Sequence, residues 1–165
     1  MMRRSAVISD CGRFRYSLSR TWVEPGHEAA DTFATFIMLN PSTADAEVDD
    51  PTIRRCIGFA KAWGLGGLMV VNLFAWRATS PRDLYSDPEN KIGAENDRHI
   101  IEACGTATNV IAAWGNHGAL LGRGNAVRSM IDDLEVLGLT TAGHPAHPLY
   151  LPGSLMPTRW GRDHA

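Results

Sequence analysis

Three short apolar runs constrain the fold more than any other feature of this 165-residue sequence. They cover residues 35–39, 67–73 and 109–114, and they do not alternate with polar residues as a half-exposed strand would. Runs of this kind are typical of strands that are covered on both faces, as in parallel sheets. The sequence therefore predicts a central sheet with helices packed on both sides.

The segments between these runs favour helices. Asp50 and Pro51 form a typical helix start, with Asp50 as the cap and Pro51 at the first helical position. Residues 92–104 and 120–137 carry apolar side chains at helical spacing. Because strands and helices alternate, we predict an α/β protein with a three-layer α/β/α fold and a mostly parallel central sheet. We expect one domain that spans residues 1–165.

Four further expectations concern the rest of the chain. Residues 13–22 predict a half-buried edge strand, with aromatic and leucine side chains on one side and arginines and serines on the other. Residues 138–142 predict a short final strand. Residues 1–5 and 161–165 are expected to be loose, while Trp160 is expected to pack back onto the body.

The composition is that of an ordinary globular protein, with 44% hydrophobic and 21% charged residues. No apolar run is long enough to span a membrane, and the start lacks the apolar core of a signal peptide, so we expect a cytoplasmic protein. The three cysteines form no CxxC pair, which argues against a zinc site, disulfides or an iron–sulfur cluster. We expect no metal, no cofactor and no obligate protein partner.

The charge pattern leaves alternatives open at two places. Net charge is −2, which does not favour a strongly basic nucleic-acid-binding protein. Arginines nevertheless crowd residues 3–20 and would form either a local basic face or an ordinary solvated surface. The carboxylates of residues 44–50 would either supply oxygen ligands for magnesium or complement the dipole of the following helix. These acidic residues are Asp45, Glu47, Asp49 and Asp50.

Polar motifs follow the predicted strands at the points where they end. The first is Asn40-Pro41-Ser42-Thr43, which is either a structural turn or a functional loop, since functional groups collect at the carboxyl ends of parallel strands. The second is Asn72, an amide inside an apolar strand, which is costly unless it finds partners. It is either a satisfied buried side chain or a group that pairs with the edge of a nucleobase, because an amide offers a donor beside an acceptor.

The third motif, Trp114-Gly115-Asn116-His117, again ends a buried strand. A lone tryptophan is more often part of the core than of a site, and the histidine after it is a weak signal.

The fourth motif is a stiff loop in which two His-Pro pairs precede Leu-Tyr-Leu, because proline fixes the backbone. Histidine can donate a hydrogen bond to developing negative charge, and the leucines and tyrosine are too apolar for an ordinary exposed loop. The alternative is a proline-rich strap that covers the core. The residues of interest are His144, His147, Leu149, Tyr150 and Leu151.

The order of these motifs resembles that of the uracil-DNA glycosylase superfamily. That superfamily has a parallel α/β/α sheet that carries an Asp-Pro or Asn-Pro loop, a strand-borne Asn, a Trp-Gly strand end and a late His-Pro loop. The similar elements here lie within residues 33–151 and are Asn40-Pro41, Asn72, Trp114-Gly115 and His144-Pro145. The chain also looks like a bacterial and phage family of unknown function that is marked by Asn-Pro-Ser-Thr and His-Pro-x-His-Pro-Leu.

The resemblance implies hydrolysis of the N-glycosidic bond of a uracil-like or modified base that is flipped out of DNA. Asn40 would position the attacking water, and Asp45 would compensate for the weak basicity of an asparagine. His144, or else His147, would hydrogen-bond the departing base.

The resemblance also implies a base-binding set and a DNA-binding set. The base-binding residues would be Asn72, Pro41, Ser42 and Trp114. The DNA-binding residues would be Thr43, Asn116, His117, Leu149, Tyr150 and Leu151, of which the last three would form a wedge that fills the gap left by the base.

Two departures keep other functions open. The Asp-Pro-Tyr form of the loop is absent, and no Tyr or Phe follows Pro41 to exclude thymine, which puts uracil specificity in doubt. Besides the glycosylase, two functions stay open: a nucleobase- or nucleotide-binding protein without hydrolysis, and an enzyme of modified-nucleoside metabolism that acts on free nucleotides. The mild net charge favours free nucleotides, whereas the apolar wedge favours DNA as the partner.

Overall fold

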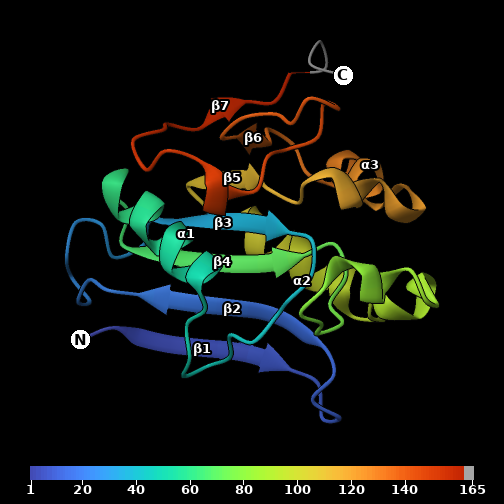
Figure 1. Ribbon diagram of the computed structural model, residues 1–165. Helices are drawn as coiled ribbons and strands as arrows, with labels where there is room; N and C mark the ends of the chain where they lie inside the picture. The colour runs from blue at the N-terminus through green and yellow to red at the C-terminus, as the bar shows by residue number, and fades with distance from the viewer. Residues whose placement is uncertain (162–165) are drawn as a thin grey trace.

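A seven-stranded mixed sheet forms the centre of the computed structural model, which describes residues 1–161 (Figure 1). The strands lie in the order β1-β2-β4-β3-β5-β6-β7. Their bounds are β1 Arg3–Ile8, β2 Arg15–Thr21, β3 Phe33–Met38, β4 Gly67–Asn72, β5 Asn109–Ala112, β6 Glu135–Val136 and β7 Thr158–Arg159. The helices are α1 Pro51–Ala62, α2 Asn96–Gly105 and α3 Arg123–Met130, and the short 3₁₀ helices are η1 Pro81–Leu84, η2 Pro88–Lys91, η3 Asn116–Gly122 and η4 Pro148–Tyr150. The loose C-terminus was expected over residues 161–165, and residues 162–165 of that stretch lie outside the described residues.

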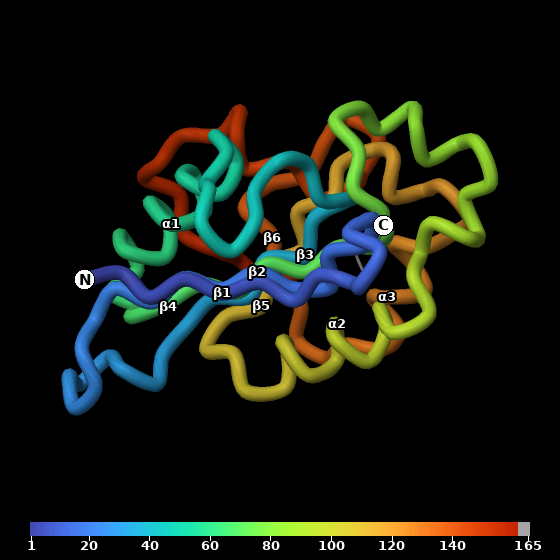
Figure 2. The backbone as a smooth tube through the Cα atoms, turned by 90° about the horizontal axis from the view of Figure 1, so that it is seen from below, coloured from blue at the N-terminus to red at the C-terminus, as the bar shows by residue number. Residues whose placement is uncertain are grey.

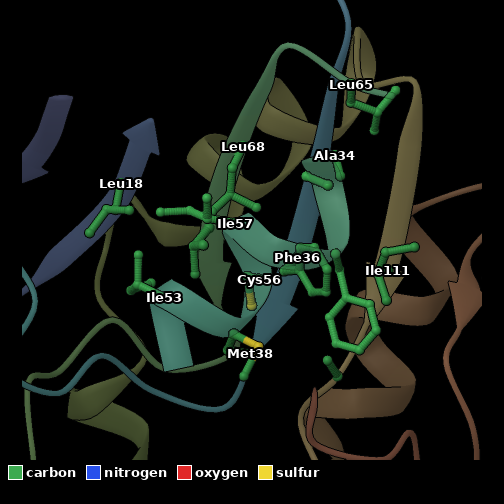
Figure 3. Close-up of a cluster of buried hydrophobic side chains, with 14 of the residues drawn as sticks. Leu18, Ala34, Phe36, Met38, Ile53, Cys56, Ile57, Leu65, Leu68 and Ile111 are labelled. Atoms are coloured by element: carbon green, nitrogen blue, oxygen red, sulfur yellow. The ribbon is translucent and has the colours of Figure 1, made fainter. Parts of the chain in front are cut away.

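Helices cover both faces of the sheet, which confirms the α/β class. Figure 2 shows α1 on one side of the sheet and α2 and α3 on the other. Since successive strand residues point to opposite faces, Phe36 packs in the core under α1 and Ile37 packs in the core under α2 and α3. Figure 3 shows the α1-side core, where Ile53 and Cys56 of α1 lie with Leu68 of β4. The three apolar runs are therefore strands covered on both faces, as predicted.

The sheet is mixed, however, and not mostly parallel. β3 pairs in parallel with β4 and β5, and β5 pairs in parallel with β6, but β1, β2 and β7 add antiparallel pairs at the two edges. β1 forms where the N-terminus was expected to be loose, and it makes β2 an interior strand instead of the expected edge. Most residues of β1 are exposed, so this strand has no apolar periodicity that sequence reasoning could detect.

A local irregularity reverses the expected orientation of residues in β2. The pairing of β2 with β1 shifts by one residue between Ser17 and Arg15, as at a β-bulge. Tyr16 consequently stacks on His99 of α2, with 5.0 Å between ring centroids, whereas Leu18 packs in the α1-side core. The expectation that the aromatic and leucine side chains of this strand share one side is therefore wrong.

The prediction of one long helix over residues 120–137 is also wrong. Leu121 has a φ of +55°, α3 ends at Met130, and Asp133 has a φ of +58°. A residue in the left-handed region interrupts a right-handed helix, so the following apolar residues form β6 instead. Residues 138–142, where the final strand was expected, form only one isolated β-bridge. The apolar spacing did not reveal either left-handed residue.

Two further expectations concern the C-terminal part and the membrane. Trp160 packs back onto the body as expected, with its ring 5.7 Å from that of Trp114. None of the helices formed by residues 1–161 combines the length and the apolar character that crossing a membrane requires.

The cysteines provide a direct test of the fold. Burial raises the pKa of Cys56 far above its ordinary value and that of Cys104 to about 12, whereas Cys11 is exposed and its hydrogen bond with Ser9 lowers its pKa. Because the thiolate is the reactive form, we expect one fast-reacting thiol per native chain and three after unfolding, measured by titration with an aromatic disulfide reagent. Cys11→Ser should remove the fast phase alone, and fast reaction of all three native thiols would contradict this packing.

Candidate functional site

A pocket of about 400 Å³ opens at the carboxyl ends of β3, β4 and β5. Its size lies within the range of roughly 300–1,000 Å³ that is usual for small-molecule sites. The predicted site residues that line it are Asn40, Pro41, Ser42, Asn72, Trp114, Asn116, His117, His147, Leu149 and Tyr150. The predicted site residues outside its lining are Thr43, Asp45, His144 and Leu151. The four loops named from the sequence therefore meet, but not every residue in them faces the pocket.

Asn72 has hydrogen-bonding capacity that the fold leaves unused. Its side chain is only 1% exposed, and neither Oδ1 nor Nδ2 has a partner among residues 1–161. Asn72 and Val70 lie on the same face of β4, and both line the pocket. Leaving a buried polar group unpaired costs about 1–3 kcal/mol. The sequence left two alternatives for Asn72. The first, a buried side chain whose hydrogen bonds are satisfied by protein groups, does not hold for this residue.

Two buried side chains fix the backbone at this end of β4. Asn96 of α2 donates to the carbonyl oxygens of Asn72 at 2.8 Å and of Leu73 at 3.1 Å. Arg123 of α3 donates to the same Leu73 oxygen from Nε and Nη2 and pairs with Asp97 at 2.8 Å. Sequence reasoning missed both supports, because a main-chain carbonyl leaves no signature that marks its partner. The amide of Asn72 is thus held on a rigid strand end.

Asn40 joins the loop after β3 to the loop after β4. Its Nδ2 donates to the carbonyl oxygens of Ala78 at 2.9 Å and Pro41 at 3.1 Å, and the backbone N–H of Ala78 donates to Pro41 at 2.9 Å. The side-chain amide donor is therefore committed, while Oδ1 accepts no hydrogen bond from residues 1–161. Because Asn40 lines the pocket, this oxygen is an acceptor that a water or ligand can use. Thr43, by contrast, is exposed outside the pocket.

Trp114 belongs to the core and to the pocket at once. Its ring is 2% exposed and packs in the core under α2 and α3, yet it also forms part of the pocket wall. Gly118 is essential to this packing, since a Cβ added there would lie 2.0 Å from Cδ1 of the tryptophan. The close approach fixes the ring plane and makes it a rigid wall.

Asn116 and His117 are exposed at the rim of the pocket. Oδ1 of Asn116 accepts a hydrogen bond from the hydroxyl of Thr140 at 2.7 Å. Nδ1 of His117 lies 2.8 Å from the hydroxyl of Tyr85. These contacts tie three loops together at the rim.

His147, and not His144, reaches the pocket. Nδ1 of His147 accepts a hydrogen bond from the backbone N–H of Leu149 at 3.2 Å, so the proton of the neutral ring resides on Nε2. Burial lowers the pKa of His147, against the opposing effect of Asp50, so the ring is a neutral donor at neutral pH. His144 lies in the turn that its backbone N–H closes onto Thr140, which removes it from the pocket lining.

The expected wedge is divided between the surface and the core. Tyr150 is 84% exposed, and its ring lies 6.0 Å from that of His147 at the pocket. Leu149 also lines the pocket, but Leu151 packs against the α1-side core, and its carbonyl oxygen accepts a hydrogen bond from Arg55. Leu151 is therefore not part of an exposed wedge, because the turn of η4 directs it to the interior.

A buried arginine holds the acidic segment in place through an ion pair and hydrogen bonds. Arg20 is fully buried and pairs through Nε with Asp49 at 2.8 Å, while Nη2 donates to the carbonyl oxygen of Asp45 at 2.6 Å. The carboxylate of Asp45 accepts from the backbone N–H groups of Glu47 and Val48, both at 2.8 Å, and these bonds lower its pKa. Within residues 1–161 no cluster of three His, Cys, Asp or Glu side chains could hold a metal ion. The described residues therefore give the magnesium interpretation no support, and the carboxylate of Asp45 is engaged in hydrogen bonds outside the pocket lining.

Arg15 and Asp50 line the pocket, although the sequence did not assign either of them to it. Arg15 is 2% exposed, its Nη1 donates to the carbonyl oxygen of Ala44 at 2.9 Å, and its Nε has no partner among residues 1–161. Asp50 caps α1 as predicted, accepting from the backbone N–H of Ile53 at 2.9 Å, and its position at the sheet edge also gives the pocket a carboxylate. The sequence left open whether the N-terminal arginines form a basic face or an ordinary solvated surface. Arg15 is buried and belongs to neither.

Comparison with known proteins places the chain in a family without assigning a function. The family model described as "Protein of unknown function (DUF1643)" matches residues 15–149. No curated protein and no solved structure matches the chain. The matched region begins at Arg15 and ends at Leu149, so it contains nearly the whole pocket lining. The likeness to the uracil-DNA glycosylase superfamily gains no support from these comparisons and rests on the order of the motifs.

Proposed function

The chain belongs to the DUF1643 family of proteins of unknown function, and from the chemistry of its pocket we propose that it is a DNA glycosylase-like hydrolase. It binds a uracil-like or modified base flipped from DNA and hydrolyses its N-glycosidic bond. The observation that carries the proposal is the buried amide of Asn72, which has no partner among residues 1–161 and lies in a pocket of small-molecule size.

The amide of Asn72 suits the edge of a nucleobase. Nucleobase edges place a hydrogen-bond donor beside an acceptor, and an asparagine side chain presents the complementary pair in one plane. The walls around it are the ring of Trp114 and the apolar side chains of Val70 and Leu149. A flat heterocycle would bury its faces against these walls and its polar edge against the amide.

The remaining polar groups of the pocket fit hydrolysis at the sugar. Oδ1 of Asn40 orients a water, and the carboxylate of Asp50 takes its proton as the new bond to the sugar carbon forms. Nε2–H of His147 donates to the departing base. Asp50 replaces Asp45 in the role that the resemblance implied, because Asp50 lines the pocket and Asp45 does not.

Features at the pocket mouth support DNA as the carrier of the base. The exposed Tyr150 beside His147 would occupy the space that a flipped base leaves in the duplex. Burial of Leu151 and the net charge of −2 favour the second candidate, a free nucleoside or nucleotide, because neither helps to grip a duplex.

Base release from a panel of oligonucleotides tests the proposal. The panel carries uracil, hypoxanthine and hydroxymethylated bases in single and double strands, with free nucleosides assayed in parallel. We expect release of at least one base from DNA, and Asp50→Asn should lower the rate by about 10²–10⁴-fold, since the general base is lost. Asparagine is as good a helix cap as aspartate, so this variant should keep α1 intact.

The matched control is Asp31→Asn, an exposed carboxylate outside the pocket, which should leave the rate unchanged. Release only from free nucleosides would replace DNA by the second candidate. Tight retention of a free base without any release would mean that the pocket binds and does not hydrolyse.

A further inference from the structure

Arg15 is a buried cation with an unused donor. Arg15 is 2% exposed, and the one hydrogen bond of its guanidinium with residues 1–161 is that from Nη1 to the carbonyl oxygen of Ala44. Nε has no partner among residues 1–161, and the residue lines the pocket. A buried charge with an unpaired N–H is costly, so a hydrogen-bond acceptor supplied by a ligand would stabilise it.

The charged groups around Arg15 leave its positive charge available. Asp50 at the start of α1 and Asp45 in the preceding loop attract it, while Arg77 after β4 and Arg20 on β2 repel it. Of these, Asp45 and Arg20 are already engaged within the loop at 44–50. Burial lowers the pKa of Arg15 to about 10, so the guanidinium is still charged at neutral pH.

The location of Arg15 indicates what it contacts. β2 is the direct neighbour of β4, so Arg15 lies beside the strand that carries Asn72, and both side chains reach the same pocket. Asp50 occupies the N-terminus of α1, where its carboxylate accepts a hydrogen bond from the backbone N–H of Ile53. A carboxylate there disfavours a phosphate dianion, which would otherwise be attracted to a helix N-terminus. A ring oxygen or a singly charged heterocycle suits Arg15 better.

We propose that Arg15 is a catalytic residue whose Nε donates to an exocyclic oxygen of the base held by Asn72 and stabilises that base as it leaves as an anion. The assignment rests on the proposed function and deepens it by naming the side chain that stabilises the negative charge of the departing base.

The chemistry balances with water as the other reactant. The bond between the sugar carbon and the base nitrogen breaks, and its electron pair stays on the base. The negative charge spreads over the ring onto the oxygen that faces Arg15. The water oxygen forms the new bond to the sugar carbon and gives its proton to Asp50, and the released base later takes a proton from solvent.

Binding of free bases tests the assignment without requiring turnover. The probes are uracil and 5-fluorouracil, whose ring N–H is more acidic, titrated from neutral to alkaline pH but below the pKa of Arg15. The wild-type protein should bind 5-fluorouracil more tightly as that base ionises. Arg15→Met should lose this preference for the anion by about 10- to 100-fold, since a hydrogen bond to a charged group is lost. Arg15→Lys keeps the charge and should retain part of the preference.

Loss of the hydrogen bond to Ala44 could lower the stability of the variants, so thermal unfolding of both is measured as a check. If Arg15→Met does not fold, Arg15→Lys still tests the assignment. Unchanged binding of both bases by the Arg15 variants would overturn the role of Arg15 while the proposed function stood. Arg15-dependent binding of inorganic phosphate, with base binding unaffected, would also overturn it. If the wild-type protein binds neither base and releases no base from the oligonucleotide panel, the proposed function itself fails.

Discussion

Replacing Asn72 by leucine should stabilise the protein and abolish its binding of bases. The substitution removes two buried amide atoms that have no partner among residues 1–161 and keeps a side chain of similar shape. We expect the free energy of unfolding to rise by about 1–3 kcal/mol, since that is the usual cost of such unsatisfied groups. Binding of a free base should weaken by about 100-fold or more, because two hydrogen bonds to the ligand are lost. Chemical denaturation and calorimetric titration measure the two effects separately.

Asn96→Leu is the matched control, because Asn96 is also fully buried and its Nδ2 is engaged, although its Oδ1 has no partner among residues 1–161. Its Nδ2 donates to the carbonyl oxygens of Asn72 and Leu73, so its loss should destabilise the fold by about 1–3 kcal/mol. The two buried asparagines should thus give stability changes of opposite sign. A loss of stability in Asn72→Leu as large as that in Asn96→Leu would mean that Asn72 serves the fold and not a ligand.

The second large effect is expected at Arg20. Arg20→Met should lower the free energy of unfolding by about 3–5 kcal/mol, because removal of one partner leaves a carboxylate without its countercharge in a partly buried place. Besides Asp49, its guanidinium holds the carbonyl oxygens of Asp45 and Val48, so the segment before α1 loses its anchor. Urea unfolding followed by tryptophan fluorescence measures the change in stability.

Arg4→Met is the control for Arg20. Arg4 pairs with Arg20 across β1 and β2, but its side chain is exposed. Its replacement should change stability by less than about 0.5 kcal/mol, as is usual for surface positions. Equal effects of the two substitutions would show that the buried network around Arg20 does not hold residues 44–50. Protection of that segment from proteolysis in Arg20→Met would point the same way.

Local pattern was enough to find the three core strands and the start of α1. Apolar runs indicate strands covered on both faces, and Asp50 before Pro51 indicates a helix cap. Both signals can be found because they depend on neighbouring residues alone. The same reasoning brought the loops of Asn40, Asn72 and Trp114 to one edge of the sheet. It failed for the 120–137 helix, where left-handed backbone at Leu121, Gly122 and Asp133 interrupts a continuous apolar pattern.

By itself, the sequence determined the α/β class, the edge of the sheet where the pocket lies and the amide of Asn72 within it. Only the tertiary structure decided that Arg15 and Asp50 line that pocket and that His147 lines it in place of His144. It also decided that Arg20 binds the acidic segment at residues 44–50. The physical reason is that periodicity reports how apolar side chains lie relative to their own backbone. It does not report which distant carbonyl or carboxylate a polar side chain will meet, and those partners decide which groups are left free to act.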